Sequence, residues 1–99
     1  MAKKTEDFLH LLSNRMSKAD ILAFAEGVGA CNCDKLLPLI VEGDRELSAN
    51  AAYVLLYARR GSQIWLSGQT EFIIDVVQST PFEKTRRLLL SLLEKLPLV

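Results

Sequence analysis

Cys31 and Cys33 are separated by a single residue, and two cysteines so close together could bind a metal ion or form a disulfide. A structural zinc site needs four ligands, and the chain has only one histidine, His10, to add to the two thiols. A disulfide between residues two positions apart would be strained. We therefore expect two reduced thiols in a turn, with no metal ion and no other cofactor.

The sequence offers no clear candidate for a catalytic residue. His10 lies off the apolar stripe formed by Phe8, Leu9 and Leu12, so we expect it to face solvent. The chain has no glycine-rich phosphate loop, no nucleophile elbow and no His-Glu-x-x-His spacing. Its carboxylates stand mostly at helix starts, where capping explains them, and their spacing selects no pair for acid–base catalysis. The sequence predicts no catalytic residue and a protein that is not an enzyme.

Three aromatic residues are the best candidates for a recognition surface, because aromatic side chains dominate interface energetics: Tyr53, Tyr57 and Trp65. The alternative is that all three belong to the core. Asn50 is a polar residue within an apolar helix. It either bonds across to a neighbouring helix pair or faces water, and the sequence does not separate these two roles.

Basic residues gather at two places. Arg59 and Arg60 close one predicted helix, and Lys84, Arg86 and Arg87 open another. Arg86 and Arg87 are candidates for an interaction surface, and a nucleic-acid-binding surface is the second function that the sequence allows. The chain has 12 Lys and Arg against 12 Asp and Glu, so its net charge of zero gives no general attraction to nucleic acid. The alternative for these cations is a solvated surface matched to helix dipoles.

Length and composition set the class of protein. At 99 residues with 49% apolar side chains, the chain is expected to form one small domain over 1–99, or a fragment of a larger one. No apolar run approaches the roughly 20 residues that a membrane-spanning helix needs. The N-terminus turns acidic at Glu6 and Asp7, unlike a signal peptide. We expect a cytoplasmic protein with no membrane association.

The apolar spacing is helical almost throughout, and no segment alternates long enough to make a strand. Six helical segments are expected, in this order: 5–13, 17 to 27 or 29, 34–43, 44–61, 69–78, and 80 to 95 or 96. The predicted N-caps are Thr5, Ser17, a residue near Asp34, Asp44 and Thr80, with Asp20 and Glu83 completing capping boxes.

Two places interrupt this pattern. Pro38 falls inside the third segment, so we expect a bend or a late start there. Residues 62–69 form the longest predicted connection, which Trp65 anchors to the core. The apolar faces include Leu22, Phe72 and the stripe formed by Leu47, Ala51, Val54, Leu55 and Ala58.

The six segments can be grouped as three antiparallel pairs, over 5–29, 34–61 and 69–96. Such repeated pairing is typical of an α-solenoid, in which one helix of each pair contacts its partner and the neighbouring pairs. A helix with neighbours on two or three sides needs small residues where backbones approach. This explains the small side chains from Ser48 to Ala52.

The segment "LLPLIVEGD" followed by "LSANAAYVLL" resembles a HEAT repeat. That family's pattern has Leu-Leu-Pro-Leu in a first helix, an Asp-led turn, and a second helix with Val-Arg, paired alanines and Leu. Here Asp44 occupies the turn, and Ala51 and Ala52 match the paired alanines. The segment "TPFEKTRRLLLSLL" resembles the second helix of another copy, with Thr85 in place of valine. The sequence departs from the pattern at Ser48, which replaces its arginine.

The resemblance covers about 34–96 and implies an all-α, short right-handed solenoid that acts as a non-catalytic protein-interaction or scaffolding module. A compact six-helix bundle is the alternative fold. The chain stops directly after its most leucine-rich helix, at "EKLPLV", without a polar cap. We therefore expect either the N-terminal part of a longer protein or a self-associating domain, so the partner is an unknown protein or a second copy of the chain.

Overall fold

The computed structural model describes residues 12, 15–27, 30–58 and 60–96. These residues form six α-helices and no β-strand: α2 (Lys18–Glu26), α3 (Ala30–Glu42), α4 (Arg45–Leu56), α5 (Arg60–Ser67), α6 (Thr70–Ser79) and α7 (Glu83–Lys95). The predicted first helix, 5–13, lies outside the described residues except for Leu12, and His10 lies outside them too. The all-α fold class is confirmed.

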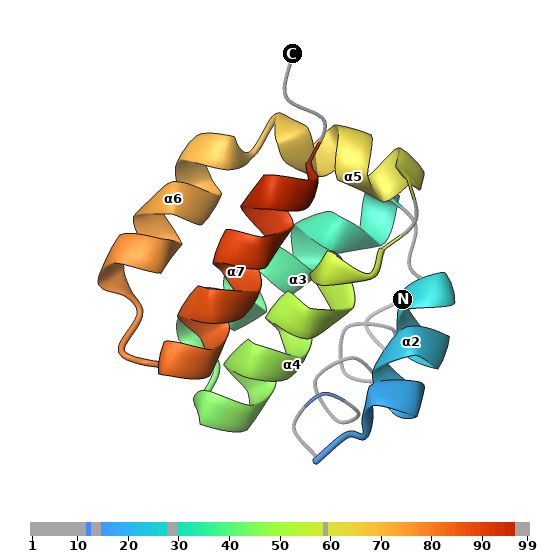
Figure 1. Ribbon diagram of the computed structural model, residues 1–99, viewed down its shortest axis with the longest axis horizontal. Helices are drawn as coiled ribbons and strands as arrows, with labels where there is room; N and C mark the ends of the chain where they lie inside the picture. The colour runs from blue at the N-terminus through green and yellow to red at the C-terminus, as the bar shows by residue number, and fades with distance from the viewer. Residues whose placement is uncertain (1–11, 13–14, 28–29, 59, 97–99) are drawn as a thin grey trace.

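Helix α4 lies at the centre of the described helices and packs against α2, α3 and α7 (Figure 1). A tight turn joins α3 to α4, and a second joins α6 to α7, so each of these pairs is antiparallel. These are the predicted pairs 34–61 and 69–96, whereas the pair 5–29 lies only partly within the described residues. Helix α5 crosses one end of the array and packs against α3.

Two contacts show that α4 and α7 run parallel. Near their N-terminal ends, the hydroxyls of Ser48 and Thr85 lie 3.0 Å apart. At their C-terminal ends, Lys95 Nζ donates to the Leu56 carbonyl over 2.9 Å. Equivalent positions in the two helices therefore differ by 37 to 39 residues. A parallel arrangement of the second helices of successive pairs is typical of a stack of helical repeats.

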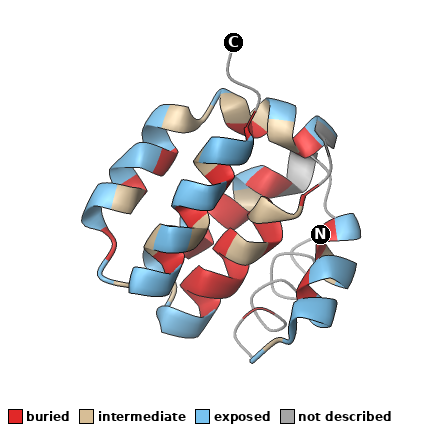
Figure 2. Ribbon diagram, viewed as in Figure 1, coloured by how far each residue is buried: buried red, intermediate tan, exposed pale blue. Residues whose placement is uncertain are grey.

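The small residues of α4 have the predicted cause. Every residue from Leu47 to Ala52 is buried, with exposed fractions between 0% and 8% (Figure 2). Six consecutive positions point in all directions around a helix, so this part of α4 is enclosed by its neighbours. Only short side chains leave room for helices on three sides. The predicted stripe from Leu47 to Ala58 is confirmed as part of the core.

Two predicted core residues are wrong: Leu22 and Phe72 are each 38% exposed. Helix α6 lies at the edge of the array and is buried mainly through Ile73 and Val76, so Phe72 falls outside that narrow contact. Helix α2 is likewise buried through Ile21 and Ala25 only. The apolar pattern of each of these two helices is wider than the side that it buries.

Two predicted N-caps, Ser17 and Asp44, are confirmed, whereas the cap predicted near Asp34 is wrong because Asp34 lies inside α3, and Thr5 lies outside the described residues. Ser17 Oγ accepts from Asp20 N over 3.2 Å and Asp20 Oδ2 accepts from Ser17 N over 3.2 Å, which completes a capping box. Asp44 Oδ1 accepts from Leu47 N over 2.9 Å.

The predicted cap at Thr80 is wrong, because α7 begins at Glu83 with Phe82 as its N-cap. Thr80 Oγ1 instead accepts from Phe82 N over 3.2 Å, which makes a tight turn before the helix. The Glu83 carboxylate pairs with Arg86 one turn further on, at 3.4 Å, instead of reaching back to complete a capping box.

Helix α3 begins at Ala30, earlier than predicted, and continues through Pro38. Cys31 and Cys33 therefore lie in a helix and not in a turn. Pro38 stands on the exposed side, while its neighbours Leu37 and Leu39 are buried. Packing of these leucines against the core holds the helix across the proline, despite the missing N–H donor.

The connection predicted after the fourth helix is also helical. Helix α4 ends at Leu56 and not at Gly61, and residues 60–67 form α5. Ser62 and Leu66 are buried one turn apart, so α5 has a narrow buried side. Trp65, predicted as an anchor, is half-buried against the core cluster.

Gly43 joins α3 to α4, as predicted, for a reason other than backbone handedness, since no described glycine has a positive φ. A Cβ atom at this position would lie 2.6 Å from the Leu39 carbonyl oxygen and 2.7 Å from Leu47 Cγ. The turn is therefore too closely packed for any side chain.

Candidate interaction surface

Tyr53 lies in the last turn of α4 and Tyr57 is the C-cap of that helix. Their ring centroids are separated by 5.4 Å and their planes are inclined by 39°. Both side chains are half-buried. Each ring therefore presents part of its surface to solvent, while the rest packs against the core cluster.

Two lysines flank Tyr57 from the neighbouring helices. Lys18 Nζ of α2 lies 5.8 Å from the ring centroid, and Lys95 Nζ of α7 lies 5.2 Å from it. Lys95 also donates to the Leu56 carbonyl, so one cation serves both the ring and the end of α4. A cation at a helix C-terminus complements the dipole, and cation–π contacts at exposed sites contribute about 0.5–1 kcal/mol. These contacts join α2, α4 and α7 at one end of the array.

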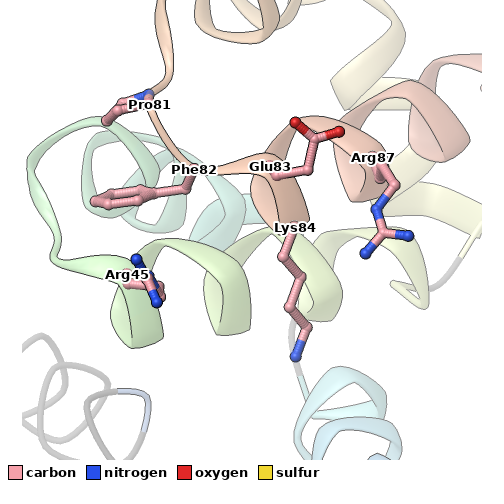
Figure 3. A pocket seen from close by; sticks show the side chains of 6 residues that line it. All are labelled: Arg45, Pro81, Phe82, Glu83, Lys84 and Arg87. Atoms are coloured by element: carbon pink, nitrogen blue, oxygen red, sulfur yellow. The ribbon is translucent and has the colours of Figure 1, made fainter.

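A depression of about 380 Å³ lies at the opposite end, where α4 and α7 begin (Figure 3). Arg45 from the first turn of α4 lines it on one side, and the remaining lining residues come from the start of α7: Pro81, Phe82, Glu83, Lys84 and Arg87. Figure 3 shows Lys84 and Arg87 extending from α7 toward the same side.

A second depression, of about 390 Å³, continues from the first and shares Lys84 and Arg87 with it. Its other lining residues are Tyr53, Leu88 and Ser91. We call the two depressions together the α4–α7 groove. Its lining residues are Arg45, Tyr53, Pro81, Phe82, Glu83, Lys84, Arg87, Leu88 and Ser91.

The charge of the α4–α7 groove is positive. Arg45, Lys84 and Arg87 are exposed, and the one ion pair among the described residues does not include any of them. Glu83 is the single carboxylate in the lining, and it pairs with Arg86. The three groove cations thus have no neutralising partner within the part of the chain described.

The positions of two of these cations oppose local helix electrostatics. Arg45 and Lys84 both lie in the first turn of a helix, where the positive end of the dipole disfavours a cation. Because α4 and α7 are parallel, both positive ends face the same end of the groove. The stability of the two helices therefore does not explain why cations occupy the positions of Arg45 and Lys84.

Arg86, predicted together with Arg87 as a surface cation, is used within the fold. Its Nε donates to the Val77 carbonyl over 3.1 Å, and its Nη2 donates to the Thr80 carbonyl over 2.9 Å. These carbonyls belong to the last turn and the C-cap of α6, so the guanidinium closes that helix end. Arg87, one position later, points instead into both depressions.

The structure therefore brings together only part of the predicted set of surface residues. Tyr53 and Arg87 line the same depression, and Tyr57 is the ring neighbour of Tyr53. Trp65, on α5, lines neither depression. Arg59 and the side chain of Arg60 lie outside the part of the chain that the structure describes.

Arg45 was missed by the sequence reasoning. The sequence feature that could have identified it is a cation directly after the N-cap Asp44.

Asn50 takes the first of its two predicted roles. Its Nδ2 donates to the Leu12 carbonyl over 2.8 Å, and both residues are buried. Asn50 thus ties α4 to the chain that precedes α2. It contributes to packing and not to the exposed surface.

Within the described ranges, no three side chains of the His, Cys, Asp or Glu type gather as a metal site would require. Cys33 is a buried thiol inside α3. None of the helices described is long and apolar enough to span a bilayer.

Stacked antiparallel helix pairs whose second helices run parallel define a helical-repeat protein. A family model for the HEAT repeat domain matches residues 8–99, so the chain belongs to the HEAT repeat family. Comparison with curated proteins and with solved structures found no match. HEAT repeat domains generally mediate protein interactions and are typically non-catalytic.

Proposed function

We propose that this HEAT repeat domain is a non-catalytic protein-interaction module, and that it binds its partner along the α4–α7 groove. The observation that carries the proposal is the lining of the groove. Three cations that have no ion-pair partner among the described residues stand beside half-buried aromatic and aliphatic side chains, Tyr53, Phe82 and Leu88. Aromatic residues and arginine are the side chains most enriched where binding energy concentrates in protein interfaces.

The groove also suits binding because its residues are placed by the most enclosed part of the fold. Arg45 and Tyr53 project from α4, whose inner residues are buried against three helices. A rigid helix face loses little conformational entropy when a partner binds. Scaffolding, in which such a module holds a partner in place, is the role we propose for the domain.

Nucleic acid binding through Arg86 and Arg87 is the second candidate function, and the geometry weighs against it. Arg86 donates to two backbone carbonyls of α6 and pairs with Glu83. The net charge of the chain is zero, so neutralisation of phosphates would rest on few cations.

Site-specific photocrosslinking tests the proposal. The photoreactive residue p-benzoylphenylalanine is placed at Tyr53 in the groove, and in a matched variant at Phe72, an exposed aromatic residue on α6. The variants are irradiated in the protein's own host. We expect a defined adduct with one other protein at Tyr53 and none at Phe72. Absence of an adduct at Tyr53, or the same adducts at both positions, would overturn the proposed surface.

A further inference from the structure

We infer that the segment bound in the α4–α7 groove is an acidic peptide whose carboxylates alternate with apolar side chains. The inference rests on the proposed function, since it names the chemistry of the partner at that same surface. It is carried by the pattern in which charged and apolar side chains line the two depressions.

The cations supply the first half of this pattern. Lys84 and Arg87 stand at the junction of the two depressions and line both, so a ligand that spans the groove must pass them. Arg45 lies across the first depression, on the other helix. Carboxylates are the natural counter-ions of a peptide at such a surface, and Arg can bind one through two parallel hydrogen bonds.

The carboxylates near these cations either bond to other groups or do not line the groove. Asp44 caps α4 through Leu47 N, and Glu83 pairs with Arg86. Glu46 and Glu94 are exposed on the same two helices but line neither depression. The positive charge of the groove is therefore not cancelled by groups of the described chain that line it.

Apolar side chains supply the second half of the pattern. Phe82 and Pro81 line the first depression, and Tyr53 and Leu88 line the second, each pair beside the shared cations. A ligand with charge alone would leave these surfaces in contact with water. A peptide with apolar residues between its acidic ones covers these surfaces, which is favourable in proportion to the apolar area removed from water.

This alternation favours a peptide over a nucleic acid. A phosphate backbone presents charge at every step and gains most of its affinity from many cation contacts. The groove offers three free cations and two apolar walls within the described residues.

Fluorescence anisotropy tests the inference with three labelled probes: a peptide of repeated Glu-Glu-Leu, the same peptide with Lys in place of Glu, and a short DNA duplex. We expect saturable binding of the acidic peptide alone, weakened by added salt because exposed ion pairs are screened. In the variant Lys84→Glu with Arg87→Glu, affinity should fall by about tenfold or more, since two attractions become repulsions.

The matched control is Arg15→Glu with Lys35→Glu, which changes the net charge equally at two residues that line neither depression. The control should bind the acidic peptide nearly as well as the parent. Circular dichroism of both variants establishes that each is folded. All four side chains are at least partly exposed, and none has a side-chain hydrogen bond to another described residue, so the fold should tolerate both pairs of substitutions.

Three outcomes would overturn the inference: no saturable binding of the acidic peptide, equal loss in the control variant, or tighter binding of the DNA duplex. The first would leave the proposed function standing if Tyr53 still forms its crosslinked adduct. A missing adduct together with failed peptide binding would remove both.

Discussion

Ser48 stands where three helices meet, and its hydrogen bonds predict that two similar substitutions have different effects on stability. Its Oγ donates to the Ile40 carbonyl of α3 over 2.7 Å and lies 3.0 Å from Thr85 Oγ1 of α7. Both hydroxyl side chains are fully buried. A hydroxyl carries one proton and a carbonyl only accepts, so Ser48 donates to Ile40 and Thr85 donates to Ser48.

The direction of these hydrogen bonds determines how much each substitution should lower the free energy of unfolding. Ser48→Ala leaves both the Ile40 carbonyl and the Thr85 hydroxyl without a partner in the core. An unsatisfied buried group costs about 1–3 kcal/mol, so we expect the free energy of unfolding to fall by about 2–4 kcal/mol. Thr85→Val removes a donor with little change in volume and leaves the bond from Ser48 to Ile40 intact. Its cost should be about 1 kcal/mol or less.

The double variant sharpens the prediction. Once Ser48 is alanine, replacing Thr85 by valine removes the stranded hydroxyl. The double variant should therefore be no less stable than Ser48→Ala alone. The resulting interaction energy between the two positions is about 1 kcal/mol.

Urea unfolding followed by far-ultraviolet circular dichroism measures all three variants, with an unchanged dependence on urea as the check on two-state behaviour. Ser79→Ala is the matched control, because Ser79 is exposed and its Oγ donates to the Asp75 carbonyl within one helix. It should change stability by no more than about 0.5 kcal/mol. Equal losses in the two single variants, or strictly additive losses in the double variant, would refute the proton assignment.

Three further substitutions test the packing of α4 and the different roles of the neighbouring residues Arg86 and Arg87. Ala51, fully buried on α4, should not accept a larger side chain: Ala51→Leu is expected to cost about 1–3 kcal/mol through overpacking, and a thermal melt equal to the parent's would contradict close helix contact there. Arg86→Ala should cost about 1–2 kcal/mol because two α6 carbonyls lose their donor, whereas Arg87→Ala should stay within about 0.5 kcal/mol of the parent. Urea unfolding of the pair compares them, and an equal loss for Arg87→Ala would mean that this residue supports the fold.

The course of α4 could be predicted from sequence because several local signals agree there. Asp44 caps it, the apolar positions recur at helical spacing, and the small residues from Ser48 to Ala52 require close neighbours. The pairing with α3 followed from the short turn at Gly43. Agreement of capping, pattern and packing at one element is what makes a local inference reliable.

Helix α5 could not be predicted for the opposite reason. Gly61, Gly68 and serines at 62 and 67 are loop signals, and they surround a short apolar run. The helix forms because Ser62 and Leu66 are buried one turn apart, a tertiary contact that local propensity does not encode. The start of α7 was misplaced in the same way. There, the Glu83 carboxylate pairs with Arg86 instead of completing a capping box, although Thr80 and Glu83 carry that motif in the sequence.

The groove was only partly visible in the sequence. Residue type singled out Tyr53 and Arg87, but nothing local associates either with Arg45. Their proximity comes from the parallel packing of helices whose matching positions differ by 37 to 39 residues. Ser48 and Asn50, which hold α4 in this packing, are polar residues in an otherwise apolar helix.

The buried polar residues of α4 determine where its surface residues lie relative to those of α7. Ser48 reaches α3 and α7, and Asn50, two positions on, reaches the Leu12 carbonyl on another side. Buried polar groups of this kind are satisfied in only one alignment of the helices, because a shift along either axis would leave them unpaired. The same alignment places Arg45 of α4 opposite Lys84 and Arg87 of α7. The departures from the repeat pattern at Ser48 and Thr85 therefore fix the spacing of the groove cations, although neither residue reaches the surface.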